Sequence, residues 1–159
     1  MIIFGIDPGY GIIGYGVIEK LGNKYNVLDY VVVTTPAKTE LSFRLNMMYD
    51  EIDAKIKEYN PDCIAIEELF FNKNITTAIA VAQARGALVL CATKAGKKIY
   101  EYTPLQIKQA ITGYGRADKG QMQRMVQILL NLTSIPKPDD AADALAVALC
   151  CGNSERFST

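Results

Sequence analysis

The N-terminal stretch reads Ile2-Ile3-Phe4-Gly5-Ile6-Asp7-Pro8-Gly9. Its first five residues form a continuous apolar run, which is typical of a strand buried on both faces of a sheet. Pro8 and Gly9 favour a turn, so we expect the strand to end here. Asp7 stands at the end of this buried strand, where an acidic side chain is unusual. The stretch therefore predicts a central strand with an acid at its carboxyl end.

The pattern on either side predicts an α/β protein of one compact domain. Two runs rich in Val, Ile and Tyr follow, and Gly22-Asn23 between them suits a hairpin turn. From Leu41 the apolar residues recur at helical spacing until Tyr59-Asn60-Pro61. We expect strands at 2–6, 14–19, 25–34, 62–67 and 99–102, and later helices at 76–95, 104–111, 119–132 and 139–151. This order predicts a mixed five-stranded sheet with helices on both faces.

The helix expected at 76–95 is rich in alanine and apolar nearly all round. Such a helix is either the central buried helix of a monomer or a subunit interface, and the pattern alone leaves both open. Gln83, Arg85 and Gly86 interrupt it, which disfavours a membrane span. The N-terminus lacks the charged region of a signal peptide, and the four cysteines lie in apolar runs without metal-site spacing. We therefore expect a cytoplasmic protein with reduced, buried thiols.

Charge is distributed unevenly along a chain whose net charge is zero. Residues 73–137 contain ten basic and two acidic residues, a net charge of +8, and the remainder carries −8. This asymmetry indicates a polyanionic partner that contacts one part of the surface. The alternative is a solvated basic helix face.

Four acids stand where the predicted fold brings them together. Asp7 ends the first strand and Glu67 the fourth, and active sites of α/β sheets form beyond the carboxyl ends of strands. Asp140 and Asp143 are spaced to share one face of the last helix. Two carboxylates ~4 Å apart repel by ~4 kcal/mol near a protein surface, so such a cluster needs cations. Magnesium prefers carboxylate ligands, and a pair of ions suits phosphodiester hydrolysis.

Each acid also has a structural interpretation. Asp7 suits the start of a turn, and Asp139 or Asp140 suits a helix N-cap. Glu68 and Asp139 are expected to be bystanders of this kind. The chain contains no histidine, which excludes Ser-His-Asp catalysis and the usual zinc sites.

Several motifs, in order along nearly the whole chain, resemble the RuvC family of Holliday junction resolvases. They are Gly5-Ile6-Asp7-Pro8-Gly9, Gly14-Tyr15-Gly16, Ala65-Ile66-Glu67 followed by Phe70, Gln83-Ala84-Arg85-Gly86, Gln106-Ile107-Lys108-Gln109, and the run from Asp140 to Ala146. The resemblance implies a ribonuclease H-like fold and a homodimer that resolves four-way DNA junctions by paired nicks. It implies Mg²⁺, with Mn²⁺ substituting and two ions per subunit during cleavage. It also implies a branch-migration helicase partner of the RuvA and RuvB type.

The resemblance also suggests roles for individual residues. The four catalytic carboxylates of the family fall on Asp7, Glu67, Asp140 and Asp143. Lys108 and Lys119 match basic residues near the scissile phosphate, and Phe70 matches an aromatic residue that inserts into the junction. By chemistry, Lys119 stabilises developing phosphate charge and Phe70 stacks on an unpaired base. Second-rank DNA contacts are expected at Phe71, Lys73, Asn74, Arg85, Tyr114 and Arg116.

Three other functions compete with this one. A different ribonuclease H-like nuclease, such as the YqgF type, would act on RNA, but the region of Phe70 and the Asp140–Asp143 helix argue against it. An actin-like or sugar-kinase ATPase would share Gly5-Ile6-Asp7-Pro8-Gly9 as a phosphate loop, but it needs a second domain. A non-catalytic junction-binding module would not need four carboxylates, which repel phosphate in the absence of metal.

Overall fold

The computed structural model describes residues 1–69 and 75–154. Its strands are β1 (Ile2–Asp7), β2 (Ile12–Leu21), β3 (Lys24–Thr34), β4 (Cys63–Glu67) and β5 (Lys98–Tyr102). Its helices are α1 (Leu41–Tyr59), α2 (Ile75–Lys94), α3 (Pro104–Thr112), α4 (Lys119–Leu129) and α5 (Asp139–Ser154). Every strand and helix expected from the sequence is present, in the expected order.

The strands form one mixed sheet in the order β3-β2-β1-β4-β5. β1 runs antiparallel to β2 and parallel to β4, and β5 is parallel to β4. A two-residue turn joins β2 to β3, and Gly22 adopts there the positive φ of 61° that glycine tolerates best. The prediction of a mixed five-stranded sheet is confirmed.

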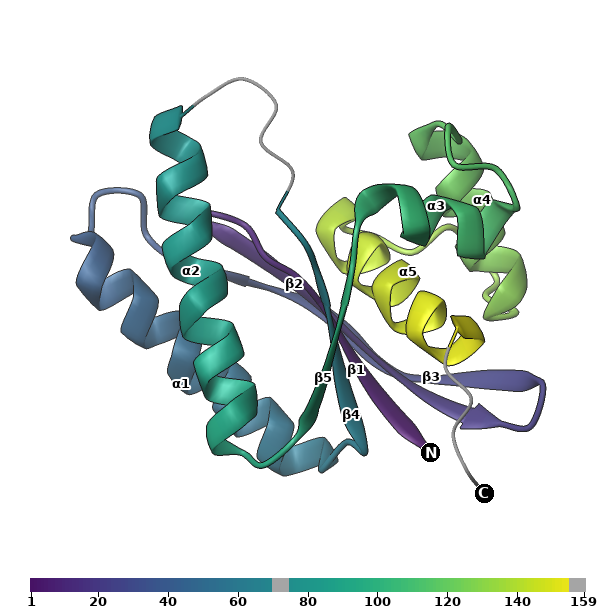
Figure 1. Ribbon diagram of the computed structural model, residues 1–159, viewed down its shortest axis with the longest axis horizontal. Helices are drawn as coiled ribbons and strands as arrows, with labels where there is room; N and C mark the ends of the chain where they lie inside the picture. Colours follow the sequence, from purple (N-terminus) through teal and green to yellow (C-terminus); the bar gives the residue numbers. More distant parts are fainter. Residues whose placement is uncertain (70–74, 155–159) are drawn as a thin grey trace.

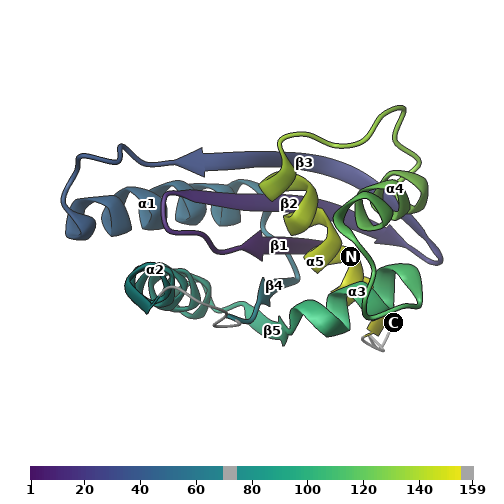
Figure 2. The same ribbon diagram turned by 90° about the horizontal axis from the view of Figure 1, so that it is seen from above.

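Helices cover both faces of this sheet (Figures 1 and 2). α1 and α2 pack on one face, while α5 lies on the other, directly against β1 and β2. α3 and α4 pack in turn against α5, which is therefore enclosed between the sheet and two helices. From Ala141 to Gly152 every residue of α5 except Asp143 is buried.

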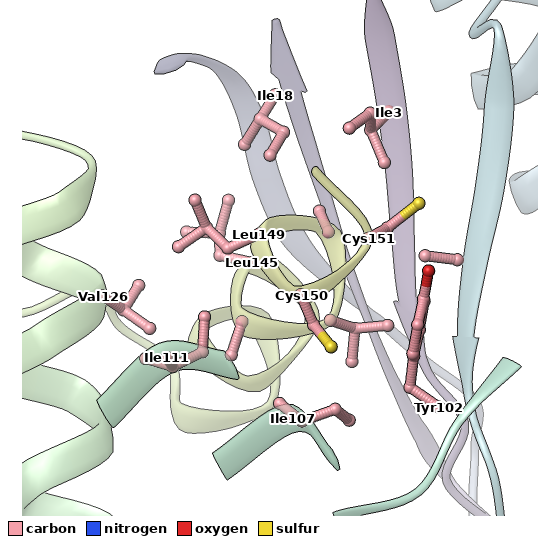
Figure 3. Close-up of a cluster of buried hydrophobic side chains, with 14 of the residues drawn as sticks. Ile3, Ile18, Tyr102, Ile107, Ile111, Val126, Leu145, Leu149, Cys150 and Cys151 are labelled. Carbon is pink, nitrogen blue, oxygen red and sulfur yellow. The ribbon is translucent and has the colours of Figure 1, made fainter. Parts of the chain in front are cut away.

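Each face of the sheet has its own hydrophobic cluster. Figure 3 shows side chains of α5 packing between the sheet and the helices α3 and α4. The labelled members of this cluster are Ile3, Ile18, Tyr102, Ile107, Ile111, Val126, Leu145, Leu149, Cys150 and Cys151. The opposite cluster joins β1, β2 and β4 to α1 and α2. All four cysteines lie within the described residues, and each is buried and outside any disulfide, as expected.

One interpretation of the alanine-rich helix is wrong. α2 is not the central buried helix, because Ile79 and Leu90 on its outer face are 56% and 55% exposed. α5 has that central place instead. Within residues 1–69 and 75–154, we find no helix with the length and apolar character that crossing a membrane requires.

Two glycines allow α5 to lie this close to the sheet. A Cβ atom on Gly5 would lie 2.2 Å from the backbone oxygen of Ala144, and one on Gly14 would lie 1.9 Å from the backbone oxygen of Asp140. Both distances are far below van der Waals contact. The backbone of α5 therefore rests on β1 and β2 at positions that no other residue type leaves open, and this sets the height of its N-terminal turn.

The helix expected at 119–132 is shorter than predicted. α4 ends at Leu129, because Asn131 takes a left-handed conformation with φ of 50° and the Leu132 amide donates to the Gln127 carbonyl. Leu130 is nonetheless buried, so the apolar spacing continues beyond the last helical turn. A pattern that reports burial does not report where the backbone leaves the helix.

Candidate active site

The ends of two parallel strands bring Asp7 and Glu67 side by side. In the pairing of β1 with β4, Ile6 lies opposite Ile66, and the two acids follow next along each strand. Both backbones leave the sheet at the same edge, so both side chains point into the space beyond it. Their carboxyl groups share a hydrogen bond.

The first turns of α5 bring further carboxylates to this edge. Asp143 lines, together with Asp7 and Glu67, a pocket of about 260 Å³. Asp140 lies one turn earlier and does not line the pocket, but its charge acts on both Asp7 and Asp143. The structure thus gathers three of the four predicted acids in one pocket and places the fourth beside it.

Burial and mutual repulsion perturb these carboxyl groups. Burial, followed by the charge and hydrogen bond of Glu67, raises the pKa of Asp7 from 3.8 to about 8. Burial also raises the pKa values of Glu67 and Asp143. A proton held by Asp7 removes one of two neighbouring negative charges at a partly buried position. A bound cation would remove the need for that proton.

We predict that the stability of the protein, measured in a chelator, falls as pH rises from about 4 to about 8. In this window folded Asp7 keeps a proton that the unfolded chain, with its ordinary pKa near 3.8, releases. Asp7→Asn should therefore raise the thermal midpoint at pH 8 by roughly 4–8 °C, equivalent to about 2 kcal/mol. Thermal denaturation of both proteins at pH 5 and pH 8 measures this; a wild-type midpoint independent of pH would contradict it.

Two lysines line the same pocket. Lys108 extends from α3 and Lys119 opens α4. The charge of Lys108 opposes the effect of burial on the pKa of Glu67, and that of Lys119 does the same for Asp143. Carboxylates and ammonium groups therefore share one open cavity, an arrangement that suits a phosphate bridged by cations.

A residue expected to be a bystander contacts one of these lysines. Asp139 forms ion pairs of 2.8 Å with Lys119 and 2.6 Å with Lys137, and it accepts a hydrogen bond of 3.0 Å from Gln123. No local signal in the sequence indicates the contacts of Asp139 with Lys119 and Gln123, because these two residues lie on another helix. Only the packing of α4 beside α5 brings the groups together.

The predicted DNA contacts differ in what the structure shows. Arg85 donates to the backbone carbonyl of Glu67 at 3.2 Å and forms an ion pair with Glu101, which ties α2 to the ends of β4 and β5. Tyr114 is 56% exposed and Arg116 is exposed. The remaining contacts, Phe70, Phe71, Lys73 and Asn74, lie outside the described residues.

Within residues 1–69 and 75–154, no three His, Cys, Asp or Glu side chains already stand in the arrangement that holds a metal ion. Asp7 and Glu67 interact with each other, and Asp143 lines the same pocket. The oxygen donors required for a hard divalent cation line one cavity, and their side chains would have to reorient to direct them at it.

Comparison with known proteins identifies the family. The sequence profile described as "Crossover junction endodeoxyribonuclease RuvC" matches residues 3–151. The chain belongs to the RuvC family. The RuvC protein of Ruminiclostridium cellulolyticum is 59% identical over 157 residues, covering 99% of this chain and 95% of its own. The RuvC protein of Clostridioides difficile is 56% identical over 157 residues, covering 99% and 93%. The family predicted from the motifs is confirmed.

Solved structures of RuvC share the fold. Thermus thermophilus RuvC in complex with Holliday junction substrate has a TM-score of 0.91 and 35% identity, covering 96% of this chain and 93% of its own. The yeast mitochondrial Holliday junction resolvase Ydc2 has a TM-score of 0.68 at 14% identity, covering 93% and 77%, and shows a common fold alone. The ribonuclease H-like fold predicted from the sequence is confirmed.

Proposed function

We propose that this chain is a metal-dependent endonuclease that resolves four-way DNA junctions by hydrolysing a phosphodiester bond in the pocket of Asp7, Glu67 and Asp143. The observation that carries the proposal is the meeting of three carboxyl groups and two lysines in one open cavity. Membership of a family whose proteins are named crossover junction endodeoxyribonucleases supports it. So does the likeness to a RuvC solved with a Holliday junction. We propose residues 1–159 as one nuclease domain.

The donor set fits a hard divalent cation. Asp7, Glu67 and Asp143 offer carboxylate oxygens in a pocket open to water, and burial together with the charges of neighbouring acids raises their pKa values, an effect that a bound cation would oppose. We propose that these three and Asp140 hold Mg²⁺, with Mn²⁺ as a substitute and two ions per subunit during cleavage. When bound, such ions polarise the scissile phosphate and supply an activated water.

The protein's own residues position the DNA strand. Lys108 on α3 and Lys119 on α4 line the cavity that Asp7 and Glu67, at the ends of β1 and β4, also line. Their ammonium groups would bind non-bridging oxygens of the scissile phosphate, and Lys119 would stabilise the charge that develops there. Arg85 holds the backbone of Glu67 in place through its carbonyl. Tyr114 and Arg116, together with Phe70, Phe71, Lys73, Asn74 and Arg85, stay predicted contacts of the junction.

The outer face of α2 supports a homodimer. Ile79, Gln83, Gly86 and Leu90 recur at helical spacing and are all exposed. Gly86 lies inside the helix, where glycine costs about 1 kcal/mol relative to alanine. A Cβ on it would meet nothing within 4 Å in this chain. A bare backbone between the exposed side chains of Ile79 and Leu90 fits the close approach of a second copy, so we propose this stripe of α2 as the dimer contact.

Ile79→Glu and Leu90→Glu should each convert the dimer to monomers, because a carboxylate on the α2 stripe would be buried without a partner. We expect a rise of at least about 100-fold in the dissociation constant, equivalent to roughly 3 kcal/mol. Sedimentation velocity over a range of concentrations measures it. Ile128→Glu, on α4 with 68% exposure, is the matched control and should leave the dimer intact. Equal loss of the dimer in the Ile128→Glu control would contradict the proposal that α2 forms the dimer interface.

The function is tested by offering a synthetic four-way junction and a linear duplex of the same sequence in magnesium, calcium or chelator. We expect paired, symmetric nicks on the junction with magnesium and no cutting of the duplex. Equal cutting of both substrates would indicate a nonspecific nuclease. An RNA of the same sequence is offered in parallel, and cutting of this RNA alone would indicate the YqgF type. Binding without cutting in every buffer would indicate a junction-binding module.

We also propose a branch-migration helicase complex of the RuvA and RuvB type as partner, on the family resemblance.

A further inference from the structure

Asp139 gathers three polar groups at the rim of the carboxylate pocket. One of its oxygens forms the 2.8 Å ion pair with Lys119; the other lies 2.6 Å from the ammonium of Lys137 and 3.0 Å from the amide nitrogen of Gln123. Both lysines are more than half exposed, so neither is held by burial. Asp139 is therefore the group that brings the two ammonium ions to one place against their mutual repulsion.

Lys119 has other acids within its electrostatic reach. The charges of Asp143 and Asp140 act on it as well as that of Asp139, and Lys119 lines the same pocket as Asp143. Its side chain is long and flexible, so an ammonium released from Asp139 has these two carboxylates as its next partners. In that position it would neutralise the groups proposed to bind metal and would leave the phosphate side of the pocket.

We propose that Asp139 is a positioning residue that holds Lys119 at the rim of the pocket, so that Asp140 and Asp143 stay available to a metal ion and Lys119 to the DNA phosphate. The inference rests on the proposed function, because it takes Asp140 and Asp143 as metal ligands. Asp139 itself touches neither the metal nor the substrate. Its effect passes through Lys119, and this makes the two residues interdependent in a way that a helix cap would not be.

The test titrates Mn²⁺ alone into the DNA-free, full-length protein and measures binding by calorimetry. Asp139→Asn should weaken Mn²⁺ binding by about two- to five-fold, the range of an exposed ion pair, because Lys119 moves onto Asp140 and Asp143. Lys119→Met should bind Mn²⁺ at least as tightly as the wild type. In the double variant, Asp139→Asn should have no further effect, since the competing ammonium is gone.

Each outcome decides the proposal. Unchanged Mn²⁺ binding in Asp139→Asn overturns it. An equal weakening with and without Lys119 also overturns it, because Asp139 would then act on the metal directly or through the fold. Asp139→Glu, which keeps the charge, should restore wild-type binding, and thermal midpoints separate loss of folding from loss of metal. If Asp7→Asn also leaves Mn²⁺ binding unchanged, the proposed metal site itself fails, independently of Asp139.

Discussion

Asp7→Asn is expected to lower the rate of junction nicking by about 1,000-fold or more while leaving junction binding within a few-fold of the wild type. The change replaces a carboxyl group that lines the pocket with an amide, which cannot ionise to help hold a catalytic cation worth several kcal/mol. Binding depends instead on basic residues and counterion release, and the loss of a negative charge does not weaken that attraction. Single-turnover nicking and an electrophoretic shift assay in calcium measure the two effects separately.

Glu68→Gln is the matched control for this prediction. Glu68 is the next acid along the chain from Glu67, but it lies outside the lining of the pocket, and we expect its substitution to change nicking less than about two-fold. Loss of binding together with nicking in Asp7→Asn would indicate misfolding. Undiminished nicking would remove Asp7 from the mechanism altogether.

Gly14→Ala should cost about 100-fold in nicking rate and about 1–3 kcal/mol in stability, although the substitution adds one methyl group. The new Cβ would overlap the carbonyl oxygen and carbon of Asp140, at 1.9 and 2.4 Å. These are backbone atoms, so the first turn of α5 must move away from the sheet, and Asp140 and Asp143 move with it. Catalysis that depends on positioning tolerates little displacement of this kind.

Chemical denaturation and single-turnover nicking together measure the effect of Gly14→Ala. Gly120→Ala is the control, because its Cβ would meet only the side-chain oxygen of Asp118 at 3.3 Å and alanine favours a helix. Normal nicking by Gly14→Ala would show that the height of α5 above β2 does not decide the geometry of the acids.

Much of the fold could be predicted because its signals are local. A few neighbouring residues are enough to predict the strand at Ile2–Ile6 and the hairpin turn at Gly22-Asn23. The helix boundary expected at 132 was wrong because apolar residues continue to be buried after the backbone leaves the helix at Leu129. The spacing of apolar residues predicts which side chains are buried better than it predicts where a helix ends.

The alanine-rich helix illustrates a different limit. α2 and α5 are both apolar and rich in small residues, and composition does not say which of them lies at the centre. The answer depends on Gly5 and Gly14, which leave room for α5 on one face of the sheet. That relation joins residues more than 100 positions apart, so only packing reveals it.

From the sequence alone one learns the order of strands and helices, the family, and the four acids at strand and helix ends, because each depends on residue types at short spacing. The tertiary structure decided which acids share the pocket, that burial beside Glu67 raises the pKa of Asp7, and that Asp139 contacts Lys119 and Lys137. The physical reason is that electrostatic interactions depend on distance through space and on burial. The spacing of residues along the chain determines neither the distance between two groups in the folded protein nor their burial.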